Sequence, residues 1–125
     1  MEKGNLFEIT PMEFPSGRKT RVMIGKNGLI SGSKFCQGYV EIEKDGSIPE
    51  HNHETVESYT ILEGMGIFTL DGEDVLLKKG DFVFIEPWQN HSLKNIANEK
   101  LKVMFVYAPQ IIVDHWEKEK KGILR

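Results

Sequence analysis

The chain has 125 residues, of which 39% are hydrophobic and 28% are charged, and its formal net charge is −3. This length suits one domain with a buried core, and the composition excludes a disordered chain. The sequence has no basic footprint for nucleic acid and no apolar run of membrane-spanning length, so neither partner is expected.

Residues 1–17 are predicted to form an irregular arm, because Pro11 and Pro15 interrupt regular structure there. The arm is too apolar for a free tail, so we expect it to pack on its own subunit or on a partner. Residues 18–24 alternate charged and apolar side chains, which indicates a strand at the edge of a sheet. Its charged residues, Arg18, Lys19 and Arg21, are expected to face water, with binding of an anion as the less favoured alternative.

Short β-rich runs and turns alternate through the rest of the chain as far as residue 107. The strands expected there cover residues 35–43, 58–62, 67–70, 75–77, 82–85, 91–96 and 101–107. Asp45-Gly46 and Asp71-Gly72 have the sequence of hairpin-type turns. Short strands at this spacing are typical of an all-β sandwich or barrel.

The tail differs from the rest, because residues 110–121 are the only stretch predicted to be helical. Residues 117–121 alternate in charge at helical spacing and are expected to form a solvated face. We expect His115 to be a surface or packing residue. The predicted organisation is an N-terminal arm (1–17), a barrel (18–109) and a C-terminal tail (110–125) that belongs to the same domain.

Cys36 is the only cysteine in the sequence, so it cannot form a disulfide within the chain. A lone thiol favours a reducing compartment, and the first residues contain no apolar segment typical of a secretory signal. We therefore expect a cytoplasmic protein. Cys36 itself is expected to be a small buried hydrophobe rather than a redox or metal thiol.

Metal-binding residue types cluster in residues 46–64, which read GSIPEHNHETVESYTILEG. Alternate residues of a strand point to the same face, so His51 and His53 present two imidazoles together, and an extended chain keeps the Glu57 carboxylate on that face. Two imidazoles and a carboxylate suit iron, manganese, nickel, copper or zinc. His91, on a later strand, is the candidate fourth ligand. Glu54 is an alternative to Glu57 but is expected to be solvated.

These residues resemble the first motif of the cupins, a family of jelly-roll proteins. That motif, G-x5-H-x-H-x3,4-E-x6-G, corresponds here to Gly46, His51, His53, Glu57 and Gly64, with the first gap one residue shorter. The second motif, G-x5-P-x-G-x2-H-x3-N, corresponds to Gly80, Pro87, His91 and Asn95. The proline is displaced by one residue, and Trp88 stands where the motif has glycine.

The resemblance implies an all-β fold, a double-stranded β-helix or jelly-roll barrel with a short C-terminal helix or tail, in a small single-domain cupin. It also implies one divalent metal ion per subunit, held by His51, His53, Glu57 and His91. Iron or manganese is favoured, and nickel or zinc is compatible with the same ligands. Small cupins of this size form dimers, so a homodimer that shares the N-terminal arm is expected.

The resemblance further implies a metal with open positions and an enzyme acting on a small organic acid, carbonyl or phenolic compound, of the dioxygenase, decarboxylase or isomerase/lyase type. Candidate catalytic groups are Glu50 and Glu86 near the barrel mouth and Tyr59, which shares the face of Glu57. The alternative is a small-ligand-binding module without chemistry. An acid or base positioned near the metal distinguishes the two. Trp88 is expected either to narrow the entrance, to stack on a substrate or to plug the barrel end.

Overall fold

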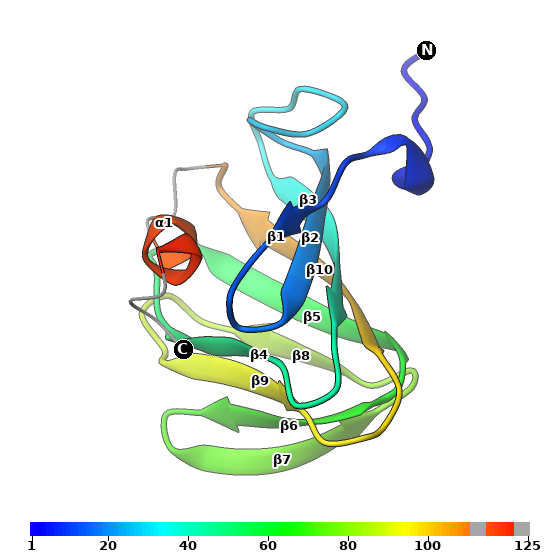
Figure 1. The fold of residues 1–125 in the computed structure, drawn as a ribbon. Coiled ribbons are helices and arrows are strands. Elements are labelled where there is room, and N and C mark those ends of the chain that lie inside the picture. Colours follow the sequence, from blue (N-terminus) through cyan, green and yellow to red (C-terminus); the bar gives the residue numbers. More distant parts are fainter. Residues whose placement is uncertain (111–114, 122–125) are drawn as a thin grey trace.

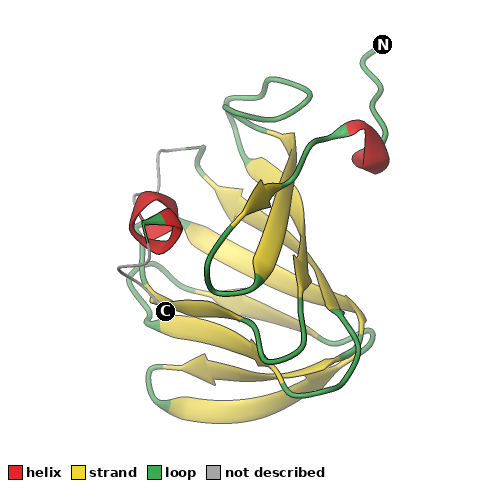
Figure 2. Cartoon of the chain, in the orientation of Figure 1, coloured by secondary structure: helices red, strands yellow, loops and turns green. Residues whose placement is uncertain are grey.

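The structure is a computed structural model that describes residues 1–110 and 115–121. Two antiparallel sheets face each other and a short helix lies beside one end of them (Figures 1 and 2). The elements in chain order are η1 (Leu6–Glu8), β1 (Met12–Glu13), β2 (Arg18–Ile24), β3 (Cys36–Ile42), β4 (Ser47–His51), β5 (Val56–Glu63), β6 (Met65–Leu70), β7 (Glu73–Lys78), β8 (Phe82–Ile85), β9 (His91–Asn95), β10 (Leu101–Ala108) and α1 (His115–Lys120).

The strand order is β1-β2-β3-β10-β5-β8 in the larger sheet and β4-β9-β6-β7 in the smaller one. Every pair of neighbouring strands is antiparallel. This arrangement confirms the predicted all-β jelly roll. None of the helices that the structure describes is long and apolar enough to cross a membrane.

The core lies between the sheets and follows from the alternation of side chains along each strand. In β10 the residues at odd positions, from Leu101 to Tyr107, are buried, and the even ones are half-buried. Gly38 faces Phe105 across the β3–β10 pair. A Cβ atom at Gly38 would lie 2.4 Å from the Phe105 ring, so only glycine fits beside that ring.

One of the two predicted hairpin turns is confirmed and the other is wrong. Asp71 and Gly72 both have positive φ, and they join β6 to β7 through the Leu70–Glu73 pair. Asp45 also has a positive φ of 65°. However, β3 and β4 belong to different sheets, so Asp45-Gly46 carries the chain from one sheet to the other instead of closing a hairpin.

The prediction that the charged residues of β2 and of the tail face water is wrong for Arg18 and Glu119. Arg18 is 2% exposed and Glu119 is 0% exposed. Arg18 is buried because it lies on the same face of β2 as Thr20 and Val22, which point into the barrel. The predicted tail helix is present over His115–Lys120. Residues 111–114 and 122–125 and the side chain of His115 lie outside the described part of the chain.

The N-terminal arm packs on its own chain through β1, which pairs with β2. Cys36 is buried, as predicted.

Asn95, the last residue of the second motif, fastens the loops at one end of the barrel. Its side-chain amide donates hydrogen bonds to the carbonyl oxygens of Ile42, Glu43 and Glu99 at 3.0, 3.2 and 2.8 Å. Its side-chain oxygen accepts one from the Ala97 amide at 2.9 Å. Asn95 is 1% exposed, so water cannot replace these bonds.

We predict that Asn95→Ala lowers the free energy of unfolding by about 2 to 4 kcal/mol, because several buried backbone groups lose their partner. Urea denaturation followed by circular dichroism measures this change. Asn98→Ala is the control, since Asn98 is exposed in the same loop, and it should change the free energy by less than about 0.5 kcal/mol. Equal effects of the two substitutions would contradict the role of Asn95.

Candidate metal centre

Two adjacent strands bring two of the candidate ligands together. His51 ends β4 and His91 begins β9, and the two residues are directly paired in the smaller sheet. The register of this strand pair shifts between Ile48 and His51. The ring centroids of His51 and His91 are 4.2 Å apart. The cross-strand pair therefore places two imidazoles side by side inside the barrel.

The other two candidate ligands come from the loop after β4 and from the larger sheet. His53 lies in the loop, and Glu57 lies on β5 with its side chain pointing inward. All four side chains are buried, and their candidate ligand atoms lie within 4.8 Å of one another. That span is near twice a metal–nitrogen distance of about 2.1 Å.

Backbone carbonyls orient the imidazoles. The Nδ1 atom of His51 lies 2.6 Å from the carbonyl oxygen of Pro49, and that of His91 lies 2.8 Å from the carbonyl oxygen of Gln89. A carbonyl oxygen only accepts hydrogen bonds, so each Nδ1 carries a proton, and in a neutral ring Nε2 then carries the lone pair. Neutral imidazoles oriented in this way are typical of metal-binding histidines.

Thr55 contacts the Nδ1 side of the His53 ring. The Nδ1 atom of His53 lies 2.6 Å from the hydroxyl oxygen and 3.2 Å from the carbonyl oxygen of Thr55, a residue with no exposed surface. Both oxygens can accept a hydrogen bond from Nδ1. Thr55, two residues after His53 in the loop that follows β4, thus fixes the orientation of the His53 ring.

The Glu57 carboxylate faces two of the imidazoles. Its Oε1 atom lies 3.1 Å from Nε2 of His53 and 3.3 Å from Nε2 of His91. In a neutral His91 ring with its proton on Nδ1, Nε2 and the carboxylate oxygen are both acceptors, and two acceptors attract each other only through a cation between them. A proton can serve in the metal-free protein, and a divalent metal ion can replace it. The donor set therefore fits a metal ion.

The electrostatics of the site keep two of these residues in the forms that a metal requires. Burial and the neighbouring His91 lower the pKa of His51 to about 3, so the ring is neutral at pH 7. Burial alone would raise the pKa of Glu57, but the contacts with His53 and His91 lower it to about 2, so the carboxylate is ionised.

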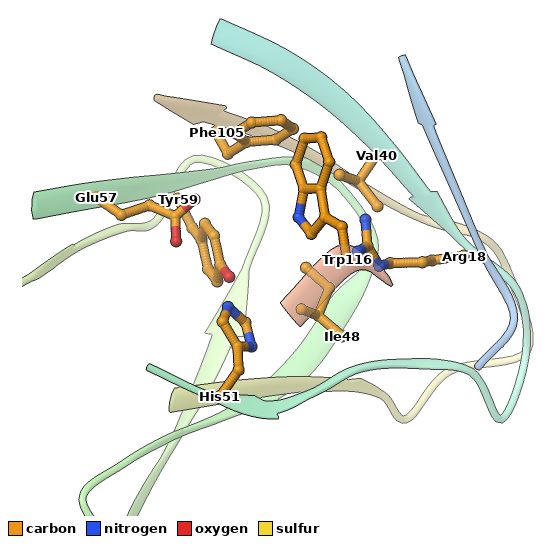
Figure 3. Close-up of a pocket in the computed structure, with 8 residues that line it drawn as sticks. All are labelled: Arg18, Val40, Ile48, His51, Glu57, Tyr59, Phe105 and Trp116. Carbon is orange, nitrogen blue, oxygen red and sulfur yellow. The ribbon is translucent and has the colours of Figure 1, made fainter. Parts of the chain in front are cut away.

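The three candidate catalytic residues lie in different surroundings. Tyr59 is buried and lines a cavity together with His51 and Glu57 (Figure 3). Burial and the charge of Glu57 raise the pKa of Tyr59 well above its ordinary value, so the phenol keeps its proton. Glu50 and Glu86 are exposed, and so is Glu54.

Trp88, which stands at the motif glycine, is 63% exposed and therefore does not plug the barrel. Its φ is 67°, a left-handed conformation that glycine adopts more easily than tryptophan. Its amide donates a hydrogen bond of 2.8 Å to the carbonyl oxygen of His53. The loop that carries Trp88 is thereby attached to a candidate metal ligand.

Arg18 and Trp116 are among the cavity residues that sequence reasoning missed, and they line it beside His51 and Glu57 (Figure 3). The alternation of β2 was a usable signal for Arg18, because Thr20 and Val22 follow it on the same face. The position of Trp116 depends on contacts with β10, where its ring meets Phe105 edge-on with centroids 6.0 Å apart. The spacing of residues within the tail carries no information about that contact.

Comparisons with known proteins agree with this site and fold. An uncharacterized protein of Methanocaldococcus jannaschii is 47% identical over 60 residues, which are 47% of this chain and 48% of that protein. An oxalate-binding protein of Thermotoga maritima is 35% identical over 68 residues, 54% of this chain and 56% of that protein. The chain thus spans about half the length of the curated relatives it matches.

Among solved structures, the polyketide cyclase RemF from Streptomyces resistomycificus has the same fold. Its TM-score is 0.73, with 94% of this chain and 91% of that chain covered at 17% identity. The family model of the cupin domain matches residues 38–107, which include all four candidate ligands and most of the barrel. This match covers more than half of the sequence, and the chain belongs to the cupin family.

Proposed function

We propose that this cupin binds one divalent metal ion through His51, His53, Glu57 and His91, and that it acts as a metal-dependent enzyme on a small organic acid, carbonyl or phenolic compound. One observation carries the proposal. The Nε2 atoms of two imidazoles lie within 3.3 Å of one carboxylate oxygen, while oxygen atoms hold their Nδ1 atoms. Such an arrangement of neighbouring acceptors calls for a cation.

When bound, a divalent metal ion with four protein ligands supplies Lewis acidity and open positions for substrate oxygens. The protein contributes the surroundings. Val40, Ile48 and Phe105 form an apolar wall of the cavity, which strengthens polar contacts by excluding water. Tyr59 keeps its proton and can donate a hydrogen bond to an anionic group in the cavity.

The metal and the reaction type form the finer part of the proposal. Iron or manganese is favoured, with a dioxygenase-type reaction for iron and an oxalate-type decarboxylation for manganese. Nickel and zinc accept the same imidazole and carboxylate donors and remain alternatives, with isomerase or lyase chemistry as the third reaction type.

A ligand-binding module without chemistry is the second candidate, and the positions of the carboxylates favour it. Glu50 and Glu86 are exposed rather than buried beside the metal site. Tyr59 holds its proton too tightly to act as a base near pH 7. The Thermotoga maritima relative is named for binding oxalate, which fits this reading.

We also propose that the protein forms a homodimer in the cytoplasm. Phe82 and Phe84 are exposed on β8, an outer strand of the larger sheet, and Phe7 is exposed on the N-terminal arm. A partner subunit would cover such apolar side chains. The single thiol of Cys36 is consistent with a reducing compartment.

We predict that the purified protein contains about one equivalent of iron or manganese, and that His53→Ala and Glu57→Ala both lose it. Elemental analysis of the three proteins measures this directly. Removing a ligand should weaken binding by more than the roughly 10- to 100-fold that follows loss of a residue that only orients a ligand. Glu54→Ala is the matched control and should keep its metal, because Glu54 is exposed.

Metal retained in both ligand variants would show that the ligands are wrongly assigned. Absence of metal after loading with Fe²⁺, Mn²⁺, Ni²⁺ and Zn²⁺ in turn would reject the metal proposal altogether.

We predict that the metal-free protein loses stability as the pH falls from about 6.5 toward 3, the ordinary and the lowered pKa of His51. The unfolded chain takes up protons in this range while buried His51 does not. Glu57 adds to the effect below its ordinary value of 4.5, because its pKa in the folded protein is about 2. Each group contributes a slope of up to about 1.4 kcal/mol per pH unit.

Urea denaturation at several pH values between neutral and acid measures these slopes. His51→Gln should lose the part of the slope that appears between the ordinary pKa of histidine and that of glutamate. A free energy of unfolding that stays constant over the whole range would contradict the lowered pKa values.

We predict that Tyr59→Phe separates the two candidate functions, because it removes the hydroxyl and keeps the ring. The metal-loaded proteins are incubated with oxalate, 2-oxo acids and catechols, and binding, oxygen uptake and carbon dioxide release are followed. If Tyr59 assists a reaction, turnover falls by about 10² to 10⁴ while metal content is unchanged. If the protein only binds, no compound is consumed, and the affinity falls by about tenfold or less.

A further inference from the structure

Among the residues that the structure describes, the buried guanidinium of Arg18 pairs with one carboxylate, that of Glu119 in α1. Nε of Arg18 donates to Oε2 of Glu119 at 2.7 Å, and Nη2 donates to Oε1 at 2.6 Å. This two-point contact is how arginine recognises carboxylates in general. Both side chains are buried, so the ion pair is withdrawn from water.

The rest of the carboxylate site comes from one short stretch of chain, residues 14–20. The Ser16 hydroxyl donates a hydrogen bond to Oε2 of Glu119, and Nη1 of Arg18 donates one to the Thr20 hydroxyl. The ring of Phe14 lies 3.8 Å from the centre of the guanidinium and fixes its plane. The donors are thus assembled by the arm and β2, whereas Glu119 lies 101 residues away in the sequence.

The Arg18 site opens on the same cavity as the metal centre. Arg18 and Trp116 line it together with His51, Glu57 and Tyr59 (Figure 3). With α1 in place, the space left for the centre of a water molecule is about 10 Å³. That is room for about one water. Trp116 therefore limits the room for a ligand in the cavity, and Glu119 occupies the donor atoms of Arg18 that a carboxylate would bind.

The contact of Glu119 with Arg18, which helps to hold α1, could be replaced by a contact with another carboxylate. A helix of six residues has little stability of its own, so its position depends on the contacts of Trp116 and Glu119. A buried ion pair contributes little net stability, because desolvation offsets the attraction. Another carboxylate with the same geometry could replace Glu119 at Arg18 without leaving a buried charge unpaired.

We propose that Arg18, supported by Ser16 and Thr20, is a carboxylate-binding subsite of the cavity, and that Glu119 occupies it as an internal competitor. The ligand class is a small organic acid whose carboxylate binds Arg18 and whose second oxygen-bearing group faces the metal centre. The Arg18 part stands on the contacts above, and only the metal-facing part rests on the proposed function.

The test uses the full chain after treatment with a chelator, so that the metal plays no part. Glu119→Ala leaves Arg18 without a counter-ion and should lower the thermal midpoint. Sodium acetate should restore the midpoint in a saturable manner, and sodium chloride at equal ionic strength should not. Glu117→Ala is the matched control, because Glu117 is exposed on the same helix, and acetate should have no specific effect on it.

A second variant separates recognition by Arg18 from general salt effects. In Arg18→Met/Glu119→Ala the acetate effect should disappear. Acetate and chloride acting alike on Glu119→Ala would overturn the proposal, and so would an acetate effect that persists in the double variant.

If Glu119→Ala does not fold, Glu119→Gln keeps the shape of the side chain and removes its charge. Calorimetric titration with acetate should then show at least about tenfold tighter binding to this variant than to the wild type, about 1.4 kcal/mol. Equal affinities would overturn the proposal.

Repeating the titration with malonate, which has two carboxylates, in metal-free and metal-loaded protein tests whether the second oxygen-bearing group of the ligand contacts the metal centre. Tighter binding to the loaded protein would support both sites together. Acetate rescue with no effect of metal on malonate would keep the Arg18 subsite and reject the metal-facing part alone.

Discussion

Four buried, electron-rich groups meet in the barrel, and they are stable together only when positive charge lies among them. Burying a carboxylate next to imidazole lone pairs would otherwise combine desolvation with repulsion. Backbone groups of the protein hold the imidazoles in this arrangement. The carbonyls of Pro49 and Gln89 hold the protons of His51 and His91 on the side away from the centre. The orientation of these two imidazoles therefore does not depend on the cation.

A few contacts of the fold bring these groups together. The pairing of His51 with His91 joins two ligands through one strand contact, and the inward face of β5 adds Glu57. Asn95 holds one end of the barrel, because its side chain bonds to both the β3–β4 and the β9–β10 connections. Each of these residues belongs to one of the two cupin motifs. The motifs thus encode barrel closure as well as ligands.

Much of this arrangement was readable from the sequence, because it depends on local rules. Alternation along strands predicted that Tyr59 shares the face of Glu57, and the spacing of His51 and His53 predicted a cluster. The errors arose where tertiary contacts decide the outcome. Asp45-Gly46 has the local conformation of a turn, yet only the sheet assignment of β4 shows that it changes sheets.

Arg18 and Glu119 were placed in water because each has a charged side chain in a charged segment. The alternation of β2 marks the inward face of Arg18, but no local pattern reveals that its carboxylate partner lies 101 residues away. The assignments of Glu50, Glu86 and Tyr59 as catalytic groups stay predictions for a related reason. Sequence identifies acids near a metal motif, but whether they act depends on a ligand whose position neither the sequence nor the fold specifies.

The distance in sequence between Arg18 and Glu119 also bears on how the protein is synthesised. Contacts between residues far apart form late, and a growing chain acquires its structure from the N-terminal side first. β2 leaves the ribosome long before Glu119 has been added. During that interval the nascent barrel holds a cation without its counter-ion, so the larger sheet cannot close tightly around Arg18. Final packing of the larger sheet around Arg18 is thereby coupled to the synthesis of α1.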